Sequence, residues 1–166
     1  TTTIKNSTFS GNQALGSGDE GGGAIALAFD SQLTLLNSTL SGNSSAANGG
    51  GISRVNNGTA TIENTIVAGN TGSGGASDLS GGGLTSSGHN LFGTLTGTSL
   101  TAQASDIVGQ SPLLAPLGNY GGATRTMALL PGSPAIDAGD TTLATDQRGI
   151  ARPQGAADDI GAFESR

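Results

Sequence analysis

A block of nine residues that occurs three times constrains the fold of this chain more than any other feature. The block begins at Ile4 as IKNSTFSGN, and it returns at Leu35 as LLNSTLSGN and at Ile62 as IENTIVAGN. Each block is followed by a run of three glycines, at residues 21–23, 49–51 and 81–83. One unit cannot bury its own apolar residues, so we expect the units to stack and share a continuous core.

The residues within each block predict short strands separated by bends. Apolar residues recur in short runs bounded by Asn and Gly, which is typical of strands and not of helices. Asn tolerates a left-handed backbone, and its amide both donates and accepts hydrogen bonds, so equivalent Asn residues one coil apart can form a ladder. Gly supplies a turn where a Cβ would clash. The predicted structural bend residues are Asn6, Asn12, Asn37, Asn43, Asn64, Asn70, Gly11, Gly42 and Gly69.

The composition agrees with stacked strands and excludes several other classes of protein. The 166 residues include 30 Gly and no Cys, and 34% are hydrophobic while 11% are charged. Gly lacks the three-residue period of collagen, and the apolar residues that recur in register argue against disorder. The net charge of −6 opposes binding to nucleic acid or to an anionic membrane surface. No apolar run is long enough to span a bilayer, so we predict no membrane insertion.

The sequence changes character after Gly93. All five Pro lie beyond this point, as do four of the six basic residues. The segments found there are GNYGG at 118–122, PGSPAIDAGD at 131–140, TDQRG at 145–149 and DDIGAFE at 158–164. An uncovered solenoid end exposes strand backbone and apolar core. We therefore expect this Pro-rich region to form an irregular cap that folds over the open end of the stack.

Two parts of the sequence are similar to known protein families. The blocks over residues 1–93 are similar to those of right-handed parallel β-helix proteins of the pectate-lyase-like superfamily, and more closely to those of repetitive bacterial surface proteins. The order of segments over 110–164 is similar to the choice-of-anchor type Q domain, which closes such proteins. The resemblance implies an all-β, right-handed parallel β-helix with an irregular C-terminal cap, located outside the cell or on the bacterial cell surface. We assign about three to four coils to residues 1–93. The last coil and the cap take residues 94–166, packed with the coils as one continuous domain.

The charged residues of the cap predict an ion-pair network that fixes its loops. Bidentate pairing of Arg with carboxylates suits that task. The candidate members are Asp137, Asp140, Asp146, Arg148, Arg152 and Asp159. Calcium held by Asp137, Asp140 and Asp146 with backbone carbonyls is the alternative, because these are hard oxygen ligands. The chain contains no D-x-D-x-D-G loop, so we predict neither a metal nor another cofactor.

The coils offer few residues for catalysis. Their acids are Asp19, Glu20, Asp30, Glu63 and Asp78, and none recurs where it would stack on another. We interpret Asp19 and Glu20 as part of a solvated Gly-rich loop. Glycoside hydrolysis needs two carboxylates that face each other across the substrate. The single histidine, His89, fits a hydrogen-bonded turn better than a catalytic base, so we predict that the chain is not an enzyme.

Our leading hypothesis is a non-catalytic structural protein that acts as a stalk, adhesin or filament subunit. The first coil predicts end-to-end stacking, either on preceding coils of the same precursor or on another copy. The alternative is a carbohydrate-active enzyme or a glycan-binding module with a groove along one coil face, which implies a surface glycan as partner. An enzyme should gather two or more acids in one groove, whereas a scaffold should scatter them.

Overall fold

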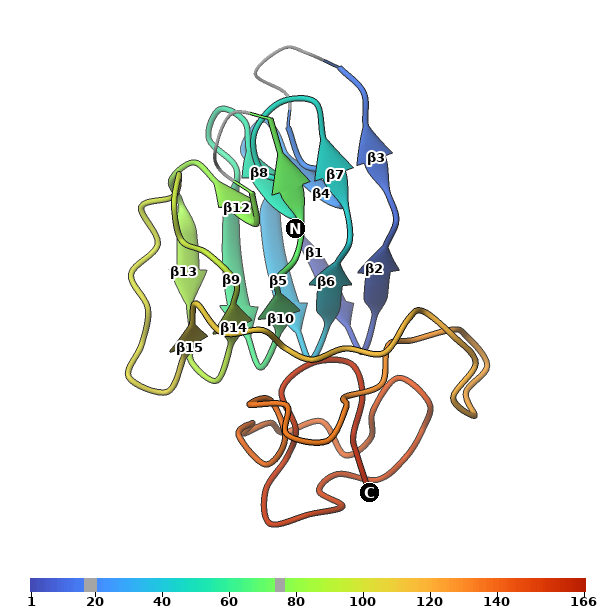
Figure 1. Ribbon diagram of the computed structural model, residues 1–166. Helices are drawn as coiled ribbons and strands as arrows, with labels where there is room; N and C mark the ends of the chain where they lie inside the picture. The colour runs from blue at the N-terminus through green and yellow to red at the C-terminus, as the bar shows by residue number, and fades with distance from the viewer. Residues whose placement is uncertain (17–20, 74–76) are drawn as a thin grey trace.

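The repeated blocks fold into a parallel β-solenoid of about three turns, shown in Figure 1. A computed structural model provides the structure, and it describes residues 1–16, 21–73 and 77–166. Within these ranges all the regular elements are strands. The described residues contain no helix with the length and apolar character needed to cross a membrane. The prediction of an all-β solenoid is confirmed. Asp19 and Glu20, expected in a solvated loop, lie outside the described residues.

The strands stack coil upon coil into four parallel sheets. Sheet A contains β1 (Thr2–Lys5), β5 (Gln32–Leu36), β9 (Thr59–Glu63) and β13 (Leu84–Ser86). Sheet B contains β2 (Thr8–Ser10), β6 (Thr39–Ser41), β10 (Ile66–Val67), β14 (Leu91–Phe92) and β15 (Ile107–Val108). Sheet C contains β3 (Gln13–Ala14), β7 (Ser44–Ser45) and β11 (Thr71–Gly72), and sheet D contains β4 (Ile25–Leu27), β8 (Ile52–Arg54) and β12 (Leu79–Ser80). Coil 1 therefore holds β1 to β4, coil 2 holds β5 to β8, coil 3 holds β9 to β12, and coil 4 begins with β13 and β14.

Residues at equivalent positions lie above one another inside the solenoid. In sheet B the register aligns Phe9, Leu40, Val67 and Phe92. The last three are fully buried, and Phe9 in coil 1 is half-buried. Successive side chains of a strand point to opposite faces of its sheet, so each strand contributes one inward stripe to the core. The stacked stripes form the continuous apolar core that no single coil could provide.

The bend between sheets A and B repeats the same backbone conformation in every coil. Asn6, Asn37 and Asn64 have φ angles of 48°, 45° and 47°, and His89 occupies this place in coil 4 with a φ of 52°. Asn reaches this left-handed region at a lower cost than most residues, because its short polar side chain can bond locally. The next bend uses Gly11, Gly42 and Gly69, with φ angles of 72°, 71° and 73°.

The Pro-rich C-terminal region lies along the side of the solenoid and not over its end, contrary to our expectation. In Figure 1 it lies below the strands of sheet B, outside the stack of coils. Its apolar residues Leu129, Ala135 and Ile160 form one cluster with Ile66 and Leu91 of sheet B. The physical reason is the outward face of sheet B. That face carries Thr in coils 1 and 2 and then Ile66, Leu91 and Ile107 in the later strands, so its apolar part needs a cover.

The end of the stack beyond coil 4 is covered by residues 94–106. Leu100 is 6% exposed and belongs to the same core cluster as Leu40, and Leu95 packs against that cluster. Thr98 forms a parallel bridge with Gly81 at the edge of sheet D. This short loop performs the closing role that the sequence alone assigns to the Pro-rich region.

The side-on packing predicts a large cost for truncating Ile66, which points out of the solenoid. In a bare solenoid this side chain would be exposed and its loss would be tolerated. Here it is fully buried under the C-terminal region. We expect Ile66→Ala to lower the free energy of unfolding by about 2–5 kcal/mol, measured by chemical denaturation. Val108→Ala is the matched control, because Val108 is 42% exposed. Equal and small effects of the two substitutions would contradict the side-on arrangement.

Candidate functional site

A seam of hydrogen bonds joins the solenoid to the C-terminal region. The corner residues Asn6, Asn37, Asn64 and His89 contact Thr145, Thr141, Asp140 and Ala138 respectively. Asn6 Nδ2 donates to the Thr145 carbonyl (2.9 Å), and the Thr141 hydroxyl donates to Asn37 Oδ1 (2.8 Å). The Asp140 amide donates to Asn64 Oδ1 (3.1 Å), and His89 Nδ1 lies 3.0 Å from the Ala138 carbonyl. Residues 138–145 therefore run along the solenoid axis from coil 4 to coil 1.

Inside the solenoid a ladder of side chains links the coils at the bend between sheets B and C. Asn12 Nδ2 donates to Asn43 Oδ1, and Asn43 Nδ2 donates to Asn70 Oδ1, both at 2.8 Å. Each Oδ1 also accepts the backbone N–H of the preceding ladder residue at 3.1 Å. In coil 4 the register places Gly93 beside Ala68, so Leu95 stands at the position that Asn70 holds in coil 3. Asp78 takes the missing role, because its Oδ1 accepts from both Nδ2 and N of Asn70 at 2.9 Å.

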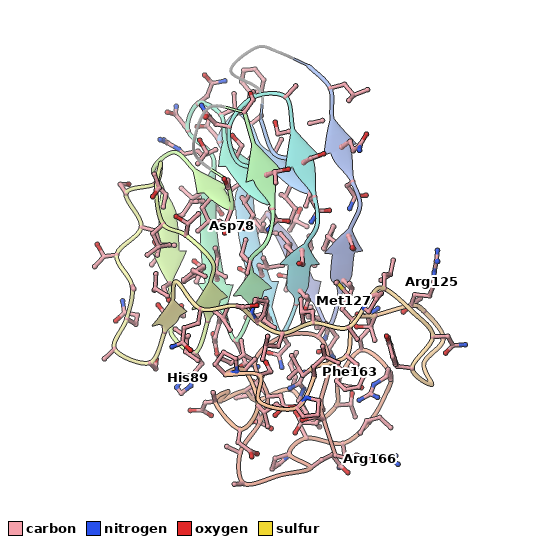
Figure 2. All side chains as sticks on the ribbon, in the orientation of Figure 1. Asp78, His89, Arg125, Met127, Phe163 and Arg166 are labelled. Carbon is pink, nitrogen blue, oxygen red and sulfur yellow. The ribbon has the colours of Figure 1, made fainter. Side chains whose placement is uncertain are left out.

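Asp78 is buried, with 3% of its surface exposed, and Figure 2 shows it inside the stack of coils. Its Oδ2 accepts the backbone N–H of Thr94 at 2.9 Å. Burial raises the pKa of this carboxyl above its usual value of 3.8, and the hydrogen bonds from Asn70 and Thr94 act in the opposite direction. The carboxylate closes the ladder, so both of its oxygens are committed to the scaffold.

A second ladder follows the bend between sheets A and B. The backbone N–H groups of Ser7, Ser38, Thr65 and Asn90 donate in turn to the side chains of Ser38, Thr65, Asn90 and Asp106. This ladder also ends in an aspartate. Asp106 Oδ1 accepts from Asn90 at 2.9 and 3.1 Å, and its Oδ2 accepts from Ser86 Oγ at 2.6 Å and from the Gln103 N–H at 2.7 Å.

The C-terminal region contains two buried ion pairs. Arg148 Nη2 lies 2.6 Å from Asp146 Oδ2, and Arg152 Nη1 lies 2.8 Å from Glu164 Oε2. Arg148 also stacks on the Phe163 ring at 3.5 Å from its centroid. Burial lowers the pKa of Arg152 and raises that of Glu164, and the charge of each partner opposes these shifts.

Four of the six residues predicted for the cap network take part in this buried cluster, and the side chains of the other two do not. Asp146, Arg148, Arg152 and Asp159 belong to the cluster. Asp159 accepts from the Asp137 amide at 2.8 Å and from the Ser165 N–H at 2.6 Å. Asp137 and Asp140 are exposed. Asp137 accepts the Ala157 N–H at 3.0 Å, whereas Asp140 contributes its backbone amide to the seam. Sequence reasoning missed Glu164, which is fully buried and pairs with Arg152.

The calcium alternative involved Asp137, Asp140 and Asp146, which the structure does not bring together as one ligand set. Across the described ranges, no group of three or more His, Asp or Glu side chains is placed to hold a metal ion. Asp146 is instead occupied by Arg148, by the N–H groups of Arg148 and Ile150, and by the N–H of Glu164.

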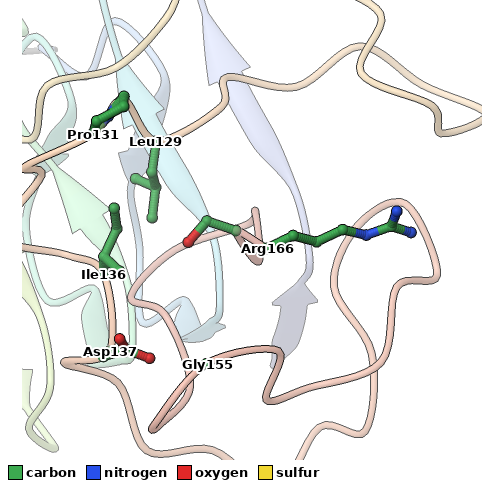
Figure 3. Close-up of a pocket in the computed structure, with 7 residues that line it drawn as sticks. Leu129, Pro131, Ile136, Asp137, Gly155 and Arg166 are labelled. Carbon is green, nitrogen blue, oxygen red and sulfur yellow. The ribbon is translucent and has the colours of Figure 1, made fainter.

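One polar cleft opens beside the seam. Its cavity volume is about 300 Å³, and Glu63, His89 and Asp140 line it together with four Ser and Thr residues. Figure 2 shows His89 at the junction of the coils and the C-terminal region. A second hollow of about 330 Å³ is mainly apolar, with Leu129, Pro131 and Ile136 on its wall. In Figure 3 the guanidinium of Arg166 points away from this second hollow.

No family model, no curated protein and no solved structure matches this chain.

The ion pair between Arg152 and Glu164 predicts that removal of the Arg side chain is severely destabilising. Both side chains are almost completely buried, so Arg152→Ala would leave a buried carboxylate without its partner. We expect the free energy of unfolding to fall by about 3–5 kcal/mol, measured by denaturant titration. Arg125→Ala is the control, since Arg125 is exposed and projects from the C-terminal region in Figure 2. A loss no larger than that of the control would show that the pair contributes little.

The raised pKa of Asp78 predicts a specific pH dependence. Between the usual Asp value of 3.8 and the raised folded value, the folded chain binds a proton that the unfolded chain has lost. The contribution of Asp78 to the free energy of unfolding therefore falls as pH rises through this window. We expect Asp78→Asn to remove that part of the slope, measured as unfolding free energy against pH for both proteins. Parallel curves for the two proteins would contradict the raised pKa.

Proposed function

We propose that this chain is a non-catalytic structural protein of the extracellular space or the bacterial cell surface, a stalk, adhesin or filament subunit built by coil stacking. The observation that carries the proposal is how the buried acids are used. Asp78, Asp146, Asp159 and Glu164 each accept backbone N–H groups that hold the scaffold together. A catalytic carboxylate must be able to reach a substrate, whereas these groups are committed to internal bonds.

The composition and the resemblance support the same role. With 11% charged residues and only six Lys and Arg, the chain offers few long side chains to a protease or to a charged partner. The blocks over 1–93 are similar to those of bacterial surface proteins, and the segments over 110–164 are similar to a domain that closes them. A rigid solenoid with an anchoring C-terminal region is suited to hold other surface domains away from a cell.

The structural role predicts resistance to proteolysis under native conditions. Arg125 lies in an exposed part of the C-terminal region, whereas Arg54 bonds to Gly58 from a strand and Arg148 and Arg152 are buried in ion pairs. We expect trypsin to cut first after Arg125, and the two pieces to stay associated because Thr126 and Leu129 are buried. Gel electrophoresis and native mass spectrometry would measure this. Early cleavage after Arg54 or Arg152 would contradict a rigid scaffold.

The polar cleft favours the alternative, a carbohydrate-active enzyme or glycan-binding module. Glu63 and Asp140 line the same hollow as His89, which is the convergence of acids that an enzyme requires. A neutral oligosaccharide could donate its hydroxyls to both carboxylates. This function requires a substrate to occupy the cleft.

A direct assay separates the two functions. The wild-type chain and the double variant Glu63→Gln, Asp140→Asn would be incubated with a panel of neutral and acidic polysaccharides, with Asp30→Asn as the control at an acid outside the cleft. The leading proposal expects neither release of reducing ends nor binding by calorimetry. Release or binding that the double variant loses and the control keeps would establish the alternative.

A further inference from the structure

The two ends of the solenoid differ in what they offer to another coil. At the end beyond coil 4, residues 94–106 lie across the core and bury Leu100. At the coil 1 end, the outer face formed by β1 to β4 has no such cover among the described residues. Ile4, Phe9 and Ile25 are only partly buried there, whereas their counterparts Leu35, Leu40 and Ile52 are fully buried. We call this outer face the coil 1 face.

The Asn ladder has a direction. Every donor in it points toward coil 4, from Asn12 to Asn43, from Asn43 to Asn70 and from Asn70 to Asp78. The coil 1 face therefore presents an acceptor, Asn12 Oδ1, at the position where Asn43 Oδ1 and Asn70 Oδ1 each receive an Nδ2 and an N–H. Asn12 is exposed, in contrast to the 1% and 3% exposure of Asn43 and Asn70.

The opposite end of both ladders is closed by acceptors that are already filled. Asp78 takes the donors of Asn70 and Thr94, and Asp106 takes those of Asn90, Ser86 and Gln103. A second copy stacked head to tail would bring these filled carboxylates and the loop 94–106 against the acceptors of the coil 1 face. Two coil 1 faces placed together would likewise set acceptor against acceptor. Neither contact between copies places an Asn amide donor at Asn12 Oδ1.

We propose that the coil 1 face binds one further coil of the same repeat type, joined ahead of Thr1, which carries an Asn in the ladder position as donor to Asn12 Oδ1. The assignment rests on the structural role proposed above. The proposed occupant of the coil 1 face is therefore an upstream coil and not a second copy of the chain. On this proposal further coils can be added to the solenoid at its coil 1 end only. The added coil would also cover Ile4, Phe9 and Ile25 with its own inward stripe.

The sequence itself supplies a suitable coil for the test. Gln32 pairs with Thr59 and Thr2 pairs with Leu33, so a copy of residues 32–58 placed directly before Thr1 continues the register. We expect the extended chain to be monomeric by light scattering and its Tm to rise by about 4 °C or more. The amides of β1 and β2 should exchange about tenfold more slowly, as measured by hydrogen–deuterium exchange.

The matched control is the same extension with Asn43→Asp in the added copy only. This change keeps the size of the side chain but replaces the Nδ2 donor with an acceptor, so most of the gain in Tm should be lost. A second extension uses residues 59–82 with Asp78→Gly, because Gly51 holds the equivalent position next to Ile52 in coil 2. This second extension keeps the test informative if the junction between residue 58 of the first copy and Thr1 does not fold.

Three results would overturn the assignment. The added coils of both extensions could remain unprotected while the 166-residue body stays folded, or the Asn43→Asp copy could stabilise as well as the Asn copy. The wild-type chain could also self-associate as its concentration rises, with protection appearing at β1 and β2, which would place a second copy on the coil 1 face. Glycan cleavage at the cleft would refute the structural role without altering any of these readouts, so the two failures are distinguishable.

Discussion

Each coil leaves polar groups inside the stack that only the next coil can satisfy, and the rest of the structure depends on this. A buried donor without a partner costs about 1–3 kcal/mol, and each step of the Asn ladder satisfies two donors with one oxygen. A slip of one residue in a strand would turn its apolar side chains outward. It would also remove the Asn from its acceptor. The apolar stripe and the ladder therefore enforce the same register.

The C-terminal region adds a connection that a simple solenoid lacks. In stacked repeats each unit ordinarily contacts only its neighbours, so that stability is a sum of local terms. Here residues 138–145 contact the corner residues Asn6, Asn37, Asn64 and His89, one in each of four successive coils. The Ile160 cluster binds the same region to the outward face of sheet B. Coils that are not adjacent are thereby linked through one segment, which favours unfolding as a single unit.

The sequence predicts the periodic part of this structure well and the rest poorly, for a physical reason. Repeats reveal strands and bends because identical residues meet identical neighbours, and the Asn6, Asn37 and Asn64 bends follow from that alone. Contacts made once in the chain leave no such signal. The pairing of Glu164 with Arg152 and the seam along the corner join segments that share no pattern. The change from Thr8 and Thr39 to Ile66 and Leu91 on the outward face was the available sign that the Pro-rich region packs on the side.

Leu95, at the Asn position of the repeat, was the corresponding sign for the end of the ladder. Where the repeat requires an Asn, Leu95 leaves the Asn70 amide in need of an acceptor, and some other side chain must supply it. Two sets of donors converge on that point, from Asn70 and from the Thr94 backbone. An amide there would accept with one atom and set its own N–H groups against a donor with the other. A carboxylate accepts with both atoms, and the cost is the desolvation that raises the pKa of Asp78. The exchange of an amide for an acid thus turns a ladder step that could be repeated into one that ends the ladder, which gives the solenoid its direction.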